Sequence, residues 1–286
     1  EKYFHNVLCL SEAKGMDITM KKITYTMEFL SSAIVSPRAG QAFYYGIDTF
    51  CREPVLCPSD SDPKGEKAVK VVYPFYQYGM YEKYDPDHAE YYLPGSSVKG
   101  ALLQKNEKKI HIMADDIPVN REQIVLKNLV KAQYVDQYNE ACFKPFFDNV
   151  GVEMLKAGSR LSGDLYLEDN TVFEEILKGA NSATADKICQ MCGYLEKLMK
   201  NEYKDTTFKD KLKKLLENLY PLAKRKDIIL VGGYKGLLHS ILLEADRLDK
   251  KQRENRERGC GIFLDCEKKL PHGLVSMQCG REIEIL

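Results

Sequence analysis

The sequence predicts an α+β protein with a ferredoxin-like βαββαβ core, and three observations lead to this fold class. Hydrophobic residues make up 44% of the 286 residues, which is enough for a substantial core. Segments with the two-residue periodicity of strands alternate with segments that have the periodicity of helices. Their order is strand, helix, strand, strand, helix, strand, at about 22–35, 96–106, 108–114, 160–168, 184–222 and 228–231. This order gives an antiparallel sheet with helices on one face, and the other face is free for a partner, as in RNA-recognition modules.

The length fits one large domain, and we expect a single module over residues 1–286. Its core, about 20–240, carries a long loop insertion near 36–90 and a helical insertion near 182–226. A C-terminal extension, 241–286, follows the core.

The first strand is expected at 22–35, where β-branched and aromatic residues alternate with polar ones. Residues 36–90 look irregular because they are rich in Tyr, Pro and Asp, and 53–67 is predicted as an exposed loop. After the helix at 96–106 and the strand at 108–114, residues 151–168 are predicted as two strands joined into a hairpin by a Lys-Ala-Gly-Ser turn.

Two apolar stripes with helical spacing predict that 182–222 is helical. The stripes are Ile188, Cys192, Leu195 and Met199, and then Phe208, Leu212, Leu215, Leu216 and Leu219. A short buried strand at 228–231 runs into a second glycine-rich loop.

The charges balance, with 42 Lys and Arg against 42 Asp and Glu. Proteins that bind long nucleic acids alone are more often basic, so any such surface here is confined or shared with other subunits. No apolar run reaches the ~18 residues of a membrane span, and no signal peptide is visible, so we expect no membrane partner and a cytoplasmic location.

The cysteines fit a reducing compartment, because their number is nine and they form no disulfide framework. Cys189 and Cys192 form one CxxC pair. A zinc site is one interpretation, but no second pair stands at ligand spacing, and buried thiols are the simpler one.

Residues 93–100 place a turn, two hydroxyls, a lysine and a glycine at the start of a helix. Ser96 or Ser97 is suited to cap the helix through its hydroxyl oxygen. Alternatively, the helix start holds an anion such as a phosphate, with Lys99 adding charge and Gly100 keeping the backbone accessible. The candidate residues are Gly95, Ser96, Ser97, Lys99 and Gly100.

The same pattern recurs after the strand at 228–231, where glycines surround an aromatic residue and a lysine. Tyr234 is suited to stack on a base and Lys235 to meet a phosphate. The alternative is a plain glycine-rich turn. The candidates here are Gly232, Gly233, Tyr234 and Lys235, and Arg38 in the loop after the first strand is a further one.

Catalytic signals are few. His239, beside the second glycine loop, is a candidate general base, although a histidine on a helix surface or in a core is the simpler interpretation. Asp48 is a candidate catalytic acid on RNA or a turn cap, and the Asp115-Asp116 pair lacks a third metal ligand.

The stretch Leu93–Ala101, LPGSSVKGA, resembles the (I/L)PGSSLKGA signature of the RAMP superfamily of CRISPR-associated proteins. Four further segments resemble later motifs of this family in the family's order: Ile110–Val119, Val152–Asp164, Leu230–Ser240 and His272–Val275. The resemblance covers most of residues 20–280.

The resemblance implies an RNA-recognition (RAMP) fold and a guide-RNA (crRNA)-binding subunit of a type III CRISPR effector complex in antiviral defence. The late glycine loop and terminal strand look most like the end-cap subunit of type III-A (Csm) complexes. Implied partners are the guide crRNA, target RNA and other type III effector subunits, with no cofactor.

Two alternatives stay open. Gly46-Ile47-Asp48 is similar to the context of the target-cleaving aspartate in the family's repeated backbone subunit, where a divalent metal would assist. A purely architectural subunit without RNA contact is the other alternative.

Overall fold

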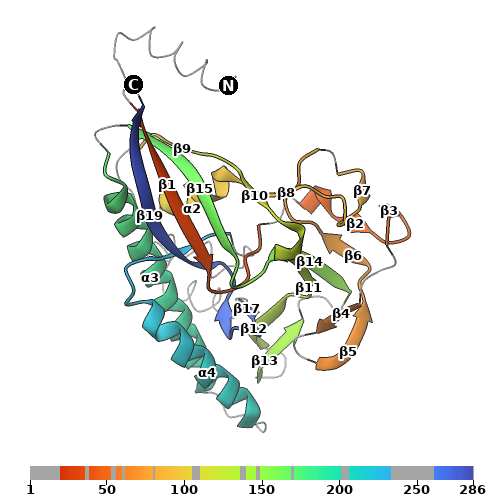
Figure 1. Ribbon diagram of the computed structural model, residues 1–286. Coiled ribbons are helices and arrows are strands. Elements are labelled where there is room, and N and C mark those ends of the chain that lie inside the picture. The colour runs from red at the N-terminus through yellow and green to blue at the C-terminus, as the bar shows by residue number, and fades with distance from the viewer. Residues whose placement is uncertain are drawn as a thin grey trace.

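The fold is α+β, as the sequence predicts, and its centre is a five-stranded antiparallel sheet (Figure 1). The computed structural model describes residues 20–35, 39–52, 56–59, 62–79, 81–104, 110–135, 140–145, 149–168, 171–200, 206–232 and 261–285. In spatial order the strands of this main sheet are β16 (Ile228–Leu230), β19 (Leu274–Ile285), β1 (Met20–Phe29), β15 (Arg160–Glu168) and β9 (Ile112–Ala114).

The alternation along β1 explains the two faces of the main sheet. Its apolar side chains are buried, and they are Ile23, Tyr25, Met27 and Phe29. The residues between them, such as Lys22 and Thr26, are partly or fully exposed. Because successive strand residues point to opposite faces, one face builds the core and the other is polar.

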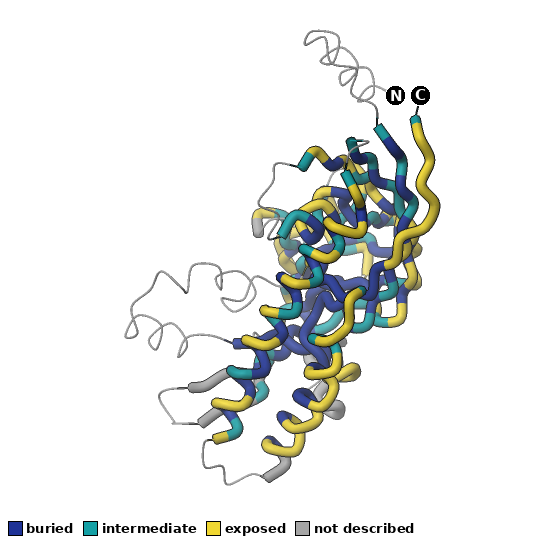
Figure 2. The backbone as a smooth tube through the Cα atoms, turned by 90° about the vertical axis from the view of Figure 1, so that its left-hand side faces the viewer, coloured by how far each residue is buried: buried dark blue, intermediate teal, exposed yellow. Residues whose placement is uncertain are grey.

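Three helices of the described part of the chain complete the core, and the prediction that helices cover one face of the sheet is confirmed (Figures 1 and 2). They are α2 (Gly95–Leu102), α3 (Phe173–Met199) and α4 (Thr206–Leu222). Val98 and Leu102 of α2 and Ile176 of α3 pack in one cluster with the buried side chains of β1.

The second half of α3 leaves the sheet and packs against α4. Both predicted apolar stripes belong to one cluster, in which every stripe residue but the partly buried Met199 is buried, and which also contains Ile228, Ile262 and Leu264. The predicted start differs from the structure, because α3 begins at Phe173. Glu174 and Glu175 in the first turn of α3 favour that early start through the helix dipole.

The predicted strand at 228–231 is present as β16, and it lies at the edge of the main sheet, where β19 separates it from β1. β19, from the segment interpreted as an extension, pairs with β1 from Met20↔Ile285 to Phe29↔Val275. β16 has three residues and pairs with β19 at the edge. The longer strand offers more pairing along β1, so it occupies the central position.

The predicted hairpin over 151–168 has the right strands but the wrong pairing. β14 (Val150–Leu155) lies in a second sheet, whereas β15 lies in the main sheet. Phe29 explains the separation, because its N–H donates to Ser159 O and its carbonyl accepts from Gly158 N–H. The end of β1 therefore occupies the turn that would otherwise join the two strands.

Residues 36–90 are not an irregular loop in the described parts. They contain β2 (Phe43–Tyr44), β3 (Thr49–Phe50), β4 (Leu56–Ser59), β5 (Asp62–Ala68), β6 (Val71–Tyr73) and β7 (Lys83–Tyr84). The second sheet has the order β11 (Ile124–Lys127), β14, β6, β2. Phe43, Val72 and Tyr84 form a small core beneath it, which makes the insertion a packed unit.

The remaining strands build smaller sheets. A third sheet has the order β13 (Glu140–Pro145), β12 (Val130–Val135), β17 (Gly261–Asp265), β18 (Leu270–Pro271), and β8 (Tyr91–Leu93) pairs with β10 (Ile117–Val119). Short 3-10 helices lie at Ala39–Gln41 and Arg121–Gln123.

A buried polar cluster ties the third sheet to the end of β1. The Asp265 carboxylate accepts hydrogen bonds from the Ser32 N–H (2.8 Å) and hydroxyl (2.7 Å). The Nδ1 atom of His272 lies 2.9 Å from the same hydroxyl oxygen. All three residues are at most 4% exposed, so the cluster fastens two sheets and has no access to substrate.

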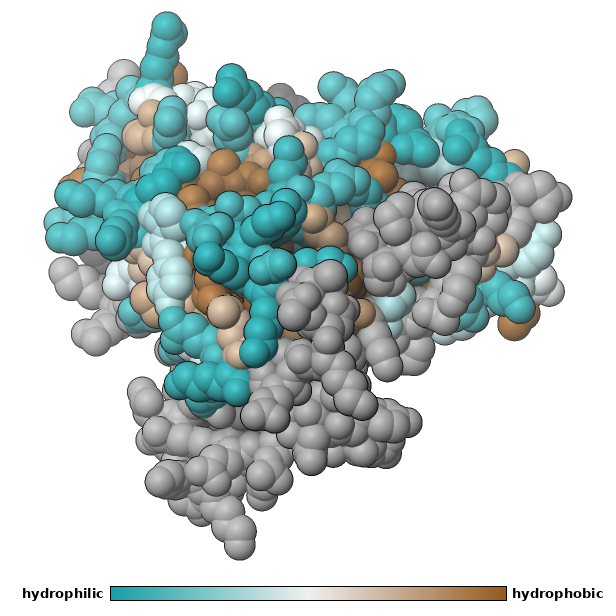
Figure 3. All heavy atoms as spheres, turned by 90° about the horizontal axis from the view of Figure 1, so that it is seen from below, coloured by the Kyte–Doolittle hydropathy of each residue, from teal (hydrophilic) through white to brown (hydrophobic). Residues whose placement is uncertain are grey.

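No helix among the described residues is long and apolar enough to cross a membrane. On the face shown in Figure 3, hydrophilic side chains dominate, and apolar surface is exposed in a hollow between them.

Candidate nucleic-acid interface

The start of α2 is capped differently from the prediction. Pro94 is the N-cap residue, and neither serine side chain caps the helix. Instead, the Gly95 N–H donates to the Asp116 Oδ1 at 2.7 Å. The prediction that Ser96 or Ser97 caps is therefore wrong, because a carboxylate from another part of the chain occupies the first donor.

Gly95 is required by packing. A Cβ atom at this position would lie 2.0 Å from the Ala114 carbonyl oxygen of β9. Only a residue without a side chain lets the helix start approach the strand this closely. The glycine thus brings α2 onto the sheet, and the anion held at its N–H is the protein's own Asp116.

The exposed face of α2 carries the other candidate residues. Ser96, Lys99 and Gly100 are exposed, and their i, i+3, i+4 spacing places them on one side of the helix. A Cβ atom at Gly100 would meet nothing within 4 Å, so the backbone there is open to a ligand. Ser97 is partly exposed beside them.

Three tyrosine rings lie in contact near this helix start, and the sequence patterns did not predict them. Tyr78 and Tyr92 are stacked, with ring centroids 4.2 Å apart and an interplanar angle of 18°. Tyr76 meets Tyr92 edge-on at 5.7 Å. The backbone explains the arrangement, because the Tyr78 N–H donates to Glu90 O and the Tyr92 N–H donates to Tyr76 O.

The tyrosines lie close to the acid that caps α2. Burial, followed by the charge of Asp116, raises the pKa of the Tyr78 phenol above its usual value. Burial raises the pKa of Tyr92 in the same direction, and Asp116 again contributes. Tyr78 is 46% exposed, so an aromatic surface is accessible near the α2 start. The signal in the sequence was the density of tyrosines at 73–92.

The second glycine loop is described only at its first residue. Gly232 has a φ of 66°, and a Cβ there would lie 2.6 Å from the Ile34 carbonyl oxygen, so close packing needs glycine. Gly233, Tyr234, Lys235 and His239 lie outside the described residues. Arg38 also lies outside them.

Asp48 is exposed and closes a tight turn. Its carboxylate accepts from the Tyr44 N–H at 2.6 Å, and its own N–H donates to Tyr44 O at 2.9 Å. This is the turn-capping geometry that was the alternative to catalysis. No group of three or more His, Cys, Asp or Glu residues stands at metal-binding distance within the described ranges.

The other metal candidates have separate surroundings. The Asp115 carboxylate accepts from the Tyr166 hydroxyl at 3.1 Å, whereas Asp116 faces α2. In the CxxC pair, Cys192 is buried between α3 and α4 and Cys189 is exposed.

The open face of the main sheet is polar, and two of its cations are paired with carboxylates of neighbouring strands. Lys22 pairs with Asp164 at 2.8 Å, and Arg160 pairs with Glu28 at 3.1 Å. These pairs neutralise the cations that a nucleic acid would need.

No protein-family model matches the sequence, and no curated protein matches it. Among solved structures, one titled "Type IV-B CRISPR Complex" is similar over 91% of this chain and 90% of that chain, with 10% identity. Its TM-score of 0.27 is too low to relate the two chains in function.

Proposed function

We propose that this chain is a guide-RNA-binding subunit of a CRISPR effector complex, of type III and most like the end-cap subunit of type III-A (Csm) complexes. The observation that carries the proposal is the juxtaposition at α2. An exposed stripe of Ser96, Lys99 and Gly100 lies on α2, in a segment that resembles the RAMP signature. An accessible tyrosine stack lies near the start of the same helix, because Asp116 both accepts from the Gly95 N–H and acts on Tyr78. One surface suits phosphates and the other suits bases.

The phosphate contact is with the side of α2. Asp116 occupies the Gly95 N–H, and its negative charge keeps phosphates from the helix axis. Lys99 supplies a positive charge one turn away, and the Ser96 hydroxyl is a hydrogen-bond donor on the same side. The bare backbone at Gly100 lets a sugar-phosphate chain pass closely.

The base contact is with the tyrosines. Stacking on an aromatic ring tolerates every base and is worth roughly 1–3 kcal/mol per base. Tyr92 is held by its pairing with residue 76, and Tyr78 extends the stack toward solvent. Sequence specificity would come from pairing between guide and target, so the protein needs only shape and backbone contacts.

Photocrosslinking of the chain to 4-thiouridine-containing guide RNA, followed by peptide mapping, tests this proposal. We expect crosslinks in residues 76–78 and 91–100, and their loss in Tyr78→Ala without loss of folding. The matched control is Tyr220→Ala on α4, because the exposed fraction of Tyr220 is 43% and that of Tyr78 is 46%. Crosslinks confined to other segments, or none at all, would contradict an RNA contact here and favour the architectural alternative.

A further inference from the structure

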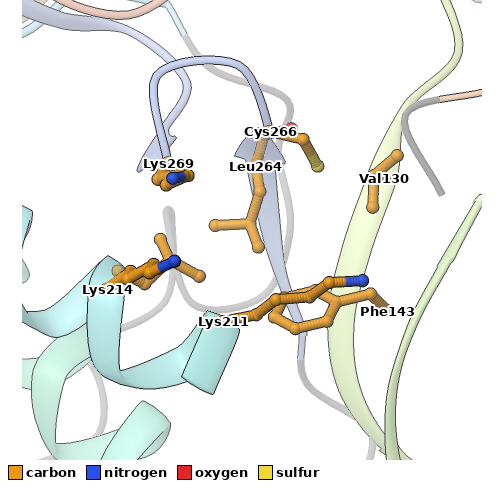
Figure 4. Close-up of a pocket in the computed structure, with 8 residues that line it drawn as sticks. Val130, Phe143, Lys211, Lys214, Leu264, Cys266 and Lys269 are labelled. Carbon is orange, nitrogen blue, oxygen red and sulfur yellow. Dashed lines mark hydrogen bonds between the residues drawn. The ribbon is translucent and has the colours of Figure 1, made fainter. Parts of the chain in front are cut away.

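A cavity of about 330 Å³ lies between α4, the β12–β13 pair and the turn that joins β17 to β18 (Figure 4). Its apolar lining comes from four elements, and the residues are Val130, Phe143, Leu215 and Leu264. The Phe143 ring is held by Phe208 of α4, with centroids 4.7 Å apart. The cavity therefore offers a preformed apolar floor that includes an aromatic ring, the usual composition of a small-molecule site.

Three lysines surround this floor. Lys211 and Lys214 reach from α4, and Lys269 reaches from the facing turn, around Leu264 (Figure 4). All three are exposed, and none forms an ion pair with a residue that the structure describes. The nearest acid in the turn sequence, Glu267, pairs with Lys127 instead. Three lysines without an ion-pair partner among the described residues thus stand at the mouth of an apolar cavity.

Lys269 is placed there by an unusual backbone. Its φ of 51° is the one left-handed value at a residue other than glycine among the described residues. Two contacts hold the turn, because Lys268 N–H donates to Asp265 Oδ1 (3.1 Å) and the Asn218 amide lies 3.3 Å from Lys268 O. Glycine would suit this φ without strain, so the lysine side chain is present at a conformational cost.

We propose that this cavity binds a nucleoside phosphate, with the base on the apolar floor and the phosphates between the three lysines. A purely inorganic anion would leave the apolar floor exposed to water, so a ligand that also carries an apolar or aromatic group fits the cavity better. The three ammonium groups match the charge of a diphosphate, which is about −3 at neutral pH. A free nucleotide and the phosphorylated terminal nucleotide of an RNA strand share this chemistry. The proposal does not depend on the RNA contact at α2.

Calorimetric titration of the full chain with ADP, adenosine and pyrophosphate tests the assignment. ADP should bind more tightly than either part alone. Lys211→Ala and Lys214→Ala should each weaken ADP binding about tenfold, the usual effect of one charge-assisted contact. Lys213→Ala is the matched control, because Lys213 is exposed on the same helix and does not line the cavity.

Lys269→Gly separates binding from folding. It removes an amine without straining the left-handed backbone, so the variant should stay folded and yet bind ADP about tenfold more weakly. A second readout is the thiol of Cys266, which lines the cavity. ADP should protect Cys266 from N-ethylmaleimide and leave the exposed Cys279 reactive.

Two RNA octanucleotides, with and without a 5′-phosphate, distinguish the sources. Tighter binding of the phosphorylated RNA than of ADP assigns the cavity to a strand terminus, and the reverse assigns it to a free nucleotide. No binding of ADP or phosphorylated RNA, or binding that is unchanged in all three cavity lysine variants, would overturn the proposal.

Discussion

Acidification should destabilise the buried polar cluster that ties the third sheet to the end of β1, because this cluster contains His272. Burial lowers the pKa of the His272 imidazole from 6.5 to about 4, although the nearby Asp265 charge opposes the shift. Burial raises the pKa of Asp265, but hydrogen bonds from Ser32 and Lys268 outweigh it and leave the value below normal. The charge of Lys127 also disfavours protonation of His272.

The sign and size of this pH effect on the free energy of unfolding follow from the difference in proton binding between the native and unfolded chain. The unfolded chain binds a proton at His272 below about pH 6.5, whereas the native chain stays neutral there until about pH 4. The contribution of neutral His272 to the free energy of unfolding is therefore fully present above pH 6.5, and it falls as the pH drops toward 4. Between pH 7.5 and pH 5 this one residue should cost about 2 kcal/mol of the free energy of unfolding.

The assay is urea unfolding at pH 7.5 and pH 5, followed by circular dichroism because the chain has no tryptophan. His272→Asn is the control, since its amide nitrogen can occupy the place of Nδ1 near Ser32 and does not titrate. Between the two pH values, the free energy of unfolding of the variant should fall by about 2 kcal/mol less than that of the wild type. Equal losses in both proteins would refute the reasoning.

Further predictions concern single residues of the fold and the candidate site. Gly95→Ala should destabilise the protein by about 1–3 kcal/mol in urea unfolding, because its Cβ meets the Ala114 carbonyl oxygen; an unchanged midpoint would show that α2 moves away freely. Asp48→Ala should cost less than about 1 kcal/mol, since the Tyr44 N–H it leaves is exposed and can bind water. The same variant, assembled into the complex, should cleave labelled target RNA as the wild type does; a loss of cleavage would support the backbone-subunit alternative.

The sequence could predict two central strands of the main sheet and the helices beside it because their patterns are local, whereas it missed the six short strands that the structure describes within 36–90. β1, β15, α2 and α4 follow from periodicity and glycine placement alone. The position of β19 could not be predicted, because it depends on pairing with a strand about 250 residues earlier. The local residue pattern does not predict which of two apolar strands will pair with β1 in the centre of the sheet.

The candidate site was predictable in its α2 residues and not in their surroundings. Asp116 caps Gly95 across 21 positions of sequence, and the tyrosine stack depends on the pairing of 76–78 with 90–92. Both are products of tertiary structure. The cavity beside Lys211 was hidden for the same reason, since α4 alone shows only an ordinary solvated lysine face.

The central claim, that α2 contacts RNA phosphates, is tested most directly by the salt dependence of RNA binding. The logarithm of the binding constant for labelled guide RNA should fall linearly with the logarithm of salt concentration. Lys99→Ala should weaken binding and reduce the slope by about 0.7, the value for one phosphate on a single strand. The exposed Lys213→Ala on α4 should leave the slope unchanged. A slope that is the same in wild type and Lys99→Ala would contradict the account.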